Sequence, residues 1–149
     1  IHWLDDPEAA FDSVASVLRP GGRFVGEFGG QGNVEAIVGA VTAEVESRGH
    51  EVENHWYFPS VGEFATSLEG HGFEVRVARL FDRPTRLDEG EDGLRSWLAM
   101  FGDSLLAPVE GEEREDVLAA VEERLRPEQF EDGAWVVDYR RLRFAAVRE

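Results

Sequence analysis

Cysteine and lysine are both absent from this 149-residue sequence, and methionine occurs once. Without cysteine the chain has no disulfide, no thiol nucleophile and no thiolate metal ligand, and without lysine it has no Schiff-base residue. No apolar run approaches the roughly 18 residues that cross a bilayer, so we predict no membrane-spanning helix. The opening Ile1-His2-Trp3 lacks the basic and apolar regions of a signal peptide, and we expect a cytoplasmic location.

Positive charge is scarce, because 31 acidic residues stand against 15 basic ones, all arginine, and the net charge is −16. A surface of this sign repels phosphate backbones, so we predict no nucleic-acid partner. The composition is consistent with a high-salt source or with a simple bias toward arginine, and both explanations remain open. Hydrophobic residues make up 42% and aromatic residues 11%, which is typical of a globular chain with a core.

The segment Leu18–Asn33 predicts a turn, a strand and a glycine-rich loop in succession. Pro20 cannot continue a helix, the following glycine pair permits a tight turn, and residues 23–28 are rich in strand formers. In open α/β sheets, ligands bind beyond the carboxyl ends of parallel strands. If residues 23–28 form such a strand, the loop after it contributes to a binding site.

The rest of the chain predicts alternating helices and strands. Apolar spacing indicates a helix from an Asp6 N-cap to Leu18, a second from near Asn33 to Gly49, and a third after a Ser60/Glu63 capping box. Residues 73–80 alternate as a strand. Helices are then expected over residues 94–105, ending by Pro108, and over residues 117–125, ending at Pro127. A last strand is expected over residues 135–147.

Two segments resemble a known family. The sequence Val17-Leu18-Arg19-Pro20-Gly21-Gly22, running into Arg23-Phe24-Val25, resembles the junction of the fourth helix and fifth strand in class I S-adenosylmethionine-dependent methyltransferases. The opening His2-Trp3-Leu4-Asp5-Asp6-Pro7 resembles the segment after the fourth strand in the trans-aconitate methyltransferase-like branch. The amino-terminal half of that family has no counterpart in the sequence.

The resemblance implies an α/β fold class, namely the C-terminal half of a Rossmann-like methyltransferase fold. It implies about three strands, the last two antiparallel, with the final strand between the other two. It also implies a single partial domain over residues 1–149, with a helical cap insertion at about residues 89–127 over the active site.

The same resemblance implies S-adenosylmethionine as the cofactor of an intact parent protein, with His2 and Trp3 near it. Catalytic residues cannot be assigned, and we predict no metal site. The candidate substrate-binding residues come from the glycine-rich loop and from aromatic segments: Phe28, Gly29, Gly30, Asn33, Trp56, Tyr57 and Trp97. Aromatic residues at helical spacing are also typical of a core, so both interpretations of Trp97 remain. Four arginines could pair with an acidic substrate: Arg79, Arg83, Arg86 and Arg140.

The favoured hypothesis is a piece of a methyltransferase that acts on a small, carboxylate-bearing molecule and is inactive alone. A stand-alone binding or interaction domain derived from that fold is the alternative. A nicotinamide-dependent oxidoreductase fragment is a third, because Gly30-Gln31-Gly32 imitates a dinucleotide fingerprint but lacks its third glycine. Because the resemblance leaves the 23–28 strand with one unpaired side, we expect a homodimer or domain-swapped pair, with Val14, Phe24, Val38 and Val41 exposed near the interface.

Overall fold

The computed structural model describes residues 1–2, 4 and 6–149, and these form two compact units. The first unit comprises Ile1–Asn33, His55–Arg83 and Tyr139–Glu149, and the second comprises Val34–Asn54 and Pro84–Asp138. Each unit has its own core. Among the described residues, no helix is both long enough and apolar enough to cross a membrane.

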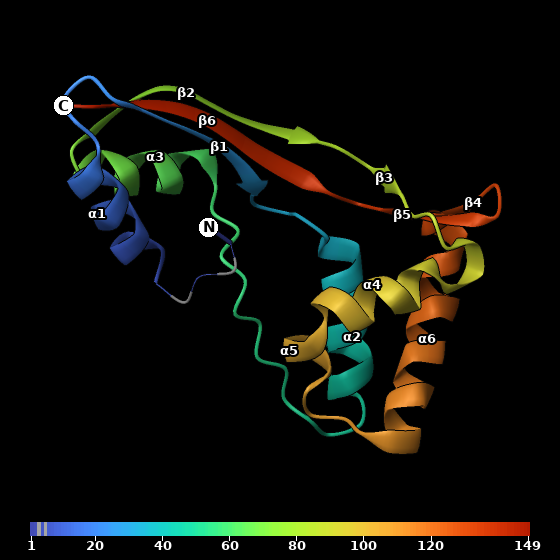
Figure 1. The fold of residues 1–149 in the computed structure, drawn as a ribbon. Coiled ribbons are helices and arrows are strands. Elements are labelled where there is room, and N and C mark those ends of the chain that lie inside the picture. The colour runs from blue at the N-terminus through green and yellow to red at the C-terminus, as the bar shows by residue number, and fades with distance from the viewer. Residues whose placement is uncertain (3, 5) are drawn as a thin grey trace. The chain divides into compact units, whose positions relative to one another are not determined.

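The first unit is a three-stranded antiparallel sheet covered on one face by helices (Figure 1). Strand β6 (Arg140–Arg148) lies in the middle, between β1 (Arg23–Gly29) and β2 (Phe73–Asp82). The predicted position of the final strand between the other two is therefore confirmed. Strand β1 pairs with β6, which runs antiparallel to it. The prediction of a ligand site in the loop after β1 assumed a parallel sheet, and no parallel neighbour of β1 is among the described strands.

Helices α1 (Pro7–Val17) and α3 (Val61–Gly70) begin where the sequence predicts. The Asp6 carboxylate accepts a hydrogen bond from the backbone N–H of Ala9 at 2.9 Å, and Pro7 occupies the first helical position. At α3, the Ser60 hydroxyl accepts from the Glu63 N–H at 3.2 Å and the Glu63 carboxylate accepts from the Ser60 N–H at 2.8 Å, which confirms the capping box.

Aromatic side chains dominate the core between the sheet and these two helices. The Phe64 ring lies 4.7 Å from Phe144 and 5.1 Å from Phe28, and it meets Phe11 edge-on at 5.8 Å between ring centroids. Such tilted and edge-on pairs add about 0.5–1.5 kcal/mol each to the burial term. The buried cluster is Phe11, Phe28, Phe64, Leu68, Phe73, Leu142, Phe144 and Ala146.

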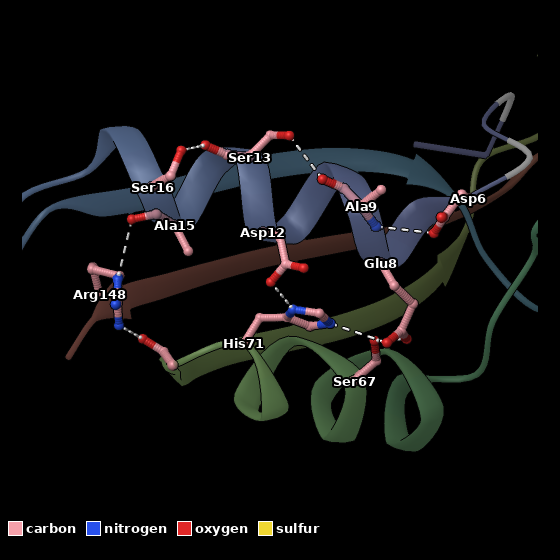
Figure 2. A network of polar contacts seen from close by, with 11 residues as sticks. Asp6, Glu8, Ala9, Asp12, Ser13, Ala15, Ser16, Ser67, His71 and Arg148 are labelled. Carbon is pink, nitrogen blue, oxygen red and sulfur yellow. Dashed lines mark hydrogen bonds and ion pairs between the residues drawn. The ribbon is translucent and has the colours of Figure 1, made fainter.

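Polar contacts hold α1 against α3 and β6 at the solvent side of this core (Figure 2). The His71 imidazole, at the C-cap of α3, contacts Asp12 and Glu8 of α1, and the Ser67 hydroxyl donates to Glu8 at 2.5 Å. The Arg148 guanidinium of β6 donates to the backbone oxygens of Ala15 and Gly72.

An irregularity in β2 changes which side chains face the core. Val75 pairs with Ala146 and Val77 with Ala145, so Arg76 is an extra residue in a β-bulge. Before the bulge the odd-numbered residues Phe73 and Val75 pack into the core, whereas after it Leu80 does. Val77, in contrast, is 54% exposed.

The second unit contains four α-helices, one 3-10 turn and a small sheet. Its helices are α2 (Glu35–Glu46), α4 (Gly93–Phe101), α5 (Asp103–Leu106) and α6 (Gly111–Gln129), with the 3-10 turn η1 at Gly90–Asp92. The strands β3 (Thr85–Arg86), β5 (Ala134–Val137) and β4 (Phe130–Glu131) pair in the order β3-β5-β4. Helix α2 packs against α6 and α5. The core residues of the second unit include Ile37, Val41, Val45, Leu94, Trp97, Leu98, Val117, Val121 and Trp135.

Three predicted element boundaries are wrong. The helix expected over residues 94–105 is split at Gly102, whose N–H donates to the Leu98 oxygen at 2.8 Å before α5 begins. Helix α6 continues past Pro127 to Gln129, because a proline in the last turn removes only one backbone donor. The strand expected over residues 135–147 is divided into β5 and β6, which belong to different sheets.

Asp138 explains the division of the last strand. Its backbone oxygen accepts from the Val34 N–H at 3.1 Å, and its carboxylate accepts from the Ala36 N–H at 2.9 Å and from the Gln129 amide at 3.0 Å. The residue therefore caps the first turn of α2 instead of extending a strand. A cap formed by a residue about a hundred positions away has no local sequence signal.

The prediction of exposed apolar residues is also wrong in part. Val41 is fully buried, Val14 and Val38 are half-buried, and Phe24 packs against Phe144 at 4.9 Å on the core side of β1. The exposed valines of the sheet are instead Val25, at 63%, and Val77, at 54%.

Candidate functional site

The His2 side chain lies at the carboxyl end of β1, between two phenylalanine rings. Its ring is stacked on Phe28, with centroids 6.4 Å apart and planes 13° apart, and lies 5.7 Å from the Phe58 ring. Burial, followed by the charges of the N-terminal amine and Arg141, lowers the pKa of His2 to about 4. The imidazole is therefore neutral at physiological pH.

The backbone N–H of Gly29 donates to Nδ1 of His2 at 3.4 Å. Because Nδ1 accepts this hydrogen bond, the proton of the neutral ring resides on Nε2. A backbone hydrogen bond connects His2 to the segment before α3, because the N–H of Tyr57 donates to the His2 backbone oxygen at 3.2 Å. Residue 2, the end of β1 and residues 57–58 thus meet at one place.

The glycines of the loop are needed for close packing. A Cβ atom at Gly29 would lie 2.6 Å from the Phe58 ring and 2.7 Å from Nδ2 of Asn33. A Cβ atom at Gly30 would lie 2.5 Å from a Leu80 methyl and 2.9 Å from Cβ of Leu142. Both approaches are to protein atoms of the same unit, so any side chain here would displace the loop.

Asn33 closes the loop onto the start of β6. Its side-chain oxygen accepts from the Arg140 N–H at 2.8 Å, while the Gly30 N–H donates to the Arg140 oxygen at 3.0 Å. Asn33 is only 4% exposed, and its part-buried contact gives its side-chain oxygen a hydrogen-bond partner. The observed role of this predicted substrate-binding residue is to hold the loop, and its contact with substrate stays a prediction.

Backbone strain follows directly after Asn33. Val34 has φ of 50° and is fully buried, although the left-handed region is unfavourable for a β-branched residue. Such strain costs of the order of 1–3 kcal/mol and persists only where surrounding contacts fix the backbone. The hydrogen bond from the Val34 N–H to Asp138 is one such contact.

The aromatic segment before α3 contributes Trp56, Tyr57 and Phe58. The rings of Trp56 and Phe58 lie 5.6 Å apart. Burial, and then the nearby carboxylates of Glu8 and Glu63, raise the pKa of the Tyr57 hydroxyl, so it stays protonated. The N–H of Gln31 donates to the Pro59 oxygen at 2.9 Å, which joins this segment to the glycine loop.

The structure brings most of the predicted site residues together. His2, Phe28, Gly29, Gly30, Asn33, Trp56 and Tyr57 all belong to the first unit. Trp97 belongs to the second unit, where it is 6% exposed and lies 5.4 Å from the Phe101 ring. Trp3 lies outside the described residues. Within the part of the chain that the structure describes, no group of three His, Asp or Glu side chains is arranged to hold a metal ion.

The arginines proposed as substrate partners are distributed over both units. Arg86 donates to the backbone oxygens of Glu131 and Asp132, and Arg140 pairs with Asp82 at 3.2 Å. Arg83 pairs with Glu27 at 3.0 Å. Sequence reasoning missed Arg141, which pairs with Gly29 across the sheet and whose charge acts on His2. Its position in the Arg140-Arg141 pair at the start of the last strand was the available signal.

The chain is similar in sequence to a fission-yeast protein named as a methyltransferase. It is 32% identical over 161 residues to an uncharacterised methyltransferase of Schizosaccharomyces pombe, a match that covers 100% of this chain and 60% of that relative. The chain therefore spans about 60% of the length of this curated relative. No family model matches the sequence.

Two solved structures share the fold. One is a Bacillus halodurans protein assigned as a methyltransferase, with a TM-score of 0.55 and 14% identity, covering 98% of this chain and 64% of that chain. The other is the YcgJ protein of Bacillus subtilis, with a TM-score of 0.54 and 14% identity, covering 99% of this chain and 60% of that chain. The chain thus has the α/β fold of Rossmann-like methyltransferases, and the yeast relative supports a methyltransferase relationship.

Proposed function

We propose that this chain is part of an S-adenosylmethionine-dependent methyltransferase that acts on a small, carboxylate-bearing molecule. The observation that carries the proposal is the match of the whole chain to 60% of the Schizosaccharomyces pombe methyltransferase, together with the shared fold. The chain would correspond to the C-terminal half of the fold, in the trans-aconitate methyltransferase-like branch. The helices between β2 and β6 would then be its cap insertion.

The residues around His2 fit the reactive end of this cofactor. S-adenosylmethionine supplies an electrophilic methyl group on a sulfonium, and a sulfonium cation is attracted to aromatic faces. The half-buried Phe58 ring, tilted against His2, would offer such a face, and the neutral imidazole of His2 adds no opposing charge. These residues would exclude water and restrict the orientation of the reacting groups.

The glycine loop does not fit the nucleotide end of the cofactor. Side chains would collide with protein atoms at both Gly29 and Gly30, so neither glycine leaves open backbone for a ligand. For the same reason, no observation favours the nicotinamide-dependent alternative. We therefore expect the 149-residue chain to bind S-adenosylmethionine poorly by itself.

Arg141 is the cation we propose for a substrate carboxylate. Its Nε lies 3.4 Å from Oε1 of Glu27, and its side chain is 21% exposed, so it is held in place but retains accessible N–H donors. A guanidinium fixed by one carboxylate can still bind a second through its remaining donors. A carboxylate nucleophile needs no general base, which agrees with the lack of an assigned catalytic acid or base.

The test has two parts. Intact mass spectrometry of the protein from its source establishes the polypeptide in which these residues occur. That protein is then assayed for transfer of labelled methyl groups from S-adenosylmethionine to a panel of small carboxylic acids, and Arg141→Gln is expected to raise KM at least about tenfold. Absence of transfer to every acid would overturn the substrate class. Micromolar calorimetric binding of S-adenosylmethionine to the 149-residue chain would overturn the proposed dependence on further residues.

The alternative of a stand-alone binding domain makes the opposite prediction. A protein that ends at these 149 residues in its source, and that neither binds nor uses S-adenosylmethionine, would favour it. The homodimer expected from the unpaired side of β1 is compatible with either function.

A further inference from the structure

Strand β2 forms one edge of the first sheet, where one side of its backbone has no neighbouring strand (Figure 1). Among the described strands it pairs only with β6. It is ten residues long, so its free side presents a long row of backbone N–H and C=O groups to any strand that approaches. This edge lies on the opposite side of β6 from β1, the strand on which the sequence-based expectation of a dimer rests.

Four exposed side chains of β2 project from the face of the sheet that is turned away from the core. In chain order they are Glu74, Arg76, Val77 and Arg79. Arg76 and Val77 are neighbours on this face because the bulge at Arg76 interrupts the alternation of the strand. Within one chain, Nη2 of Arg76 lies 2.6 Å from Oε2 of Glu74. Arg79 has no carboxylate partner among the described residues, and its guanidinium lies 5.5 Å over the Phe81 ring.

This order of side chains is complementary to itself when two copies of β2 run antiparallel. If Arg76 lies opposite Val77 of a second copy, Glu74 lies opposite Arg79 of that copy. Residues opposite each other in antiparallel strands project to the same face, so their side chains meet. A two-fold axis repeats the contact, because the same patch is used by both copies. The register therefore gives two ion pairs between the copies.

The side chains on the core face match in the same register. Phe73 lies opposite Leu80 of the second copy, and Val75 lies opposite Ala78. Phe73 belongs to the buried core cluster, and Val75 and Leu80 pack against it. A slip of one residue would instead place Glu74 opposite Leu80 or Ala78, which face the other side of the sheet. The pattern of the two faces therefore selects one register.

The bulge permits this pairing, although bulges and charges commonly protect sheet edges from association. When a bulged strand pairs with a regular one, one residue of the bulge is left over. In the two-fold register the bulges of the two copies face each other, so both strands have the same number of residues between the ion pairs. Val77, which is 54% exposed in the single chain, then lies against the aliphatic stem of Arg76 of the second copy.

We propose that the protein forms a two-fold homodimer in which β2 pairs antiparallel with β2 of a second copy, with Glu74 of each copy opposite Arg79 of the other. The sheets of the two copies then join into one, in the order β1-β6-β2-β2-β6-β1. Each copy carries a net charge of −16, so the ion pairs select this edge against the general repulsion between the chains. The pairing needs no contact with a cofactor or substrate and does not depend on the proposed function.

The first test is sedimentation equilibrium of charge-reversal variants in about 0.3 M salt, where long-range repulsion is screened and charges in contact still interact. Wild type is expected to dimerise. Arg79→Glu and Glu74→Arg each place like charges opposite each other twice, so each should raise the dimer dissociation constant at least about tenfold. An equimolar mixture of the two variants should associate within about threefold of wild type, because both pairs again join opposite charges.

Two control variants make the same changes in net charge away from β2. Arg19→Glu and Glu123→Arg alter exposed residues, and their dissociation constants should stay within about twofold of wild type. Circular dichroism checks the folding of every variant. Arg79→Gln replaces Arg79→Glu if that variant does not fold, and it should raise the dissociation constant at least about threefold because both ion pairs are lost.

The second test uses the absence of cysteine from the sequence to determine the register. Opposed residues of antiparallel strands have Cα atoms about 4.5–5.5 Å apart, which a disulfide can span. A mixture of Glu74→Cys and Arg79→Cys should therefore form a disulfide-linked dimer on mild oxidation. Neither variant should do so alone, because two cysteines at the same position would lie roughly 16 Å apart along the strands.

Four results would overturn the proposal. They are a monomeric wild type, a dimer that Arg79→Glu weakens no more than Arg19→Glu does, no restored association in the mixture of charge-reversal variants, and cross-linking of a single cysteine variant as strong as that of the mixture. The second would place the contact at another surface, such as the edge of β1, and the fourth would show a different register of β2.

Discussion

The His71 imidazole and the Asp12 carboxylate form a 2.6 Å hydrogen bond that connects the end of α3 to α1 (Figure 2). Nε2 of the same ring meets the Glu8 carboxylate at 3.0 Å. Both ring nitrogens can donate to carboxylates only when the imidazole is protonated. The hydrogen bonds to Asp12 and then Glu8 accordingly raise the pKa of His71.

The free energy of unfolding should therefore fall as pH rises above about 6.5. The pKa of His71 is higher in the folded state than its ordinary value of about 6.5, so its contribution is complete below about pH 6.5. It is lost as pH rises through the folded-state pKa. Urea unfolding of wild type and His71→Gln should show this slope only in wild type, with the variant about 1 kcal/mol less stable at pH 6. The control His50→Gln lies in the other unit, and an unchanged slope in His71→Gln would contradict the assignment.

His2 predicts a second pH dependence, on the acid side. Its folded-state pKa is about 4, below the ordinary value of about 6.5, so the unfolded chain binds this proton more readily. The free energy of unfolding should fall as pH drops from about 6.5 toward 4. His2→Gln should remove this slope between about pH 6.5 and 5.5, a range in which ordinary carboxyl groups are still more than about nine-tenths ionised. A slope that persists in the variant would show that another group is responsible.

Gly30 and Gly39 form a matched pair for testing the loop. Gly30→Ala places Cβ within 2.5 Å of Leu80, so we expect the free energy of unfolding to fall by about 1–3 kcal/mol. Gly39 lies inside α2, and a Cβ atom there meets nothing within 4 Å, so Gly39→Ala should raise stability by about 0.5–1 kcal/mol. Denaturant midpoints of the two variants measure both effects. If Gly30→Ala is tolerated, the loop is looser than its packing indicates.

The edge position of β1 predicts association. Among the described strands β1 pairs only with β6, so one side of its backbone is available for pairing. High salt screens the repulsion between copies that each carry a net charge of −16. Sedimentation equilibrium at about 1 M salt should therefore give a concentration-dependent mass that approaches a dimer. A monomer at all concentrations would rule out the expected pair.

Local signals in the sequence determined many elements of this protein. Two helices begin at the positions predicted from their caps, α1 after Asp6 and α3 after the Ser60/Glu63 capping box. These starts are predictable because a cap depends on residues only three or four positions apart. Family-specific segments near the start of the chain indicated the order β1-β6-β2. The resemblance also placed His2 near the cofactor of an intact parent protein, and that role stays a prediction.

Only the tertiary structure decided the features that depend on distant contacts. Asp138 leaves the last strand to cap α2, and Gly30 is glycine because Leu80 and Leu142 approach it. The bulge at Arg76 reverses the side-chain alternation of β2, so Val77 and Arg79 face outward beside Ala145 and Arg143. Alternation in the sequence cannot reveal that reversal, because the pairing register belongs to two strands and is fixed when both are packed on one core.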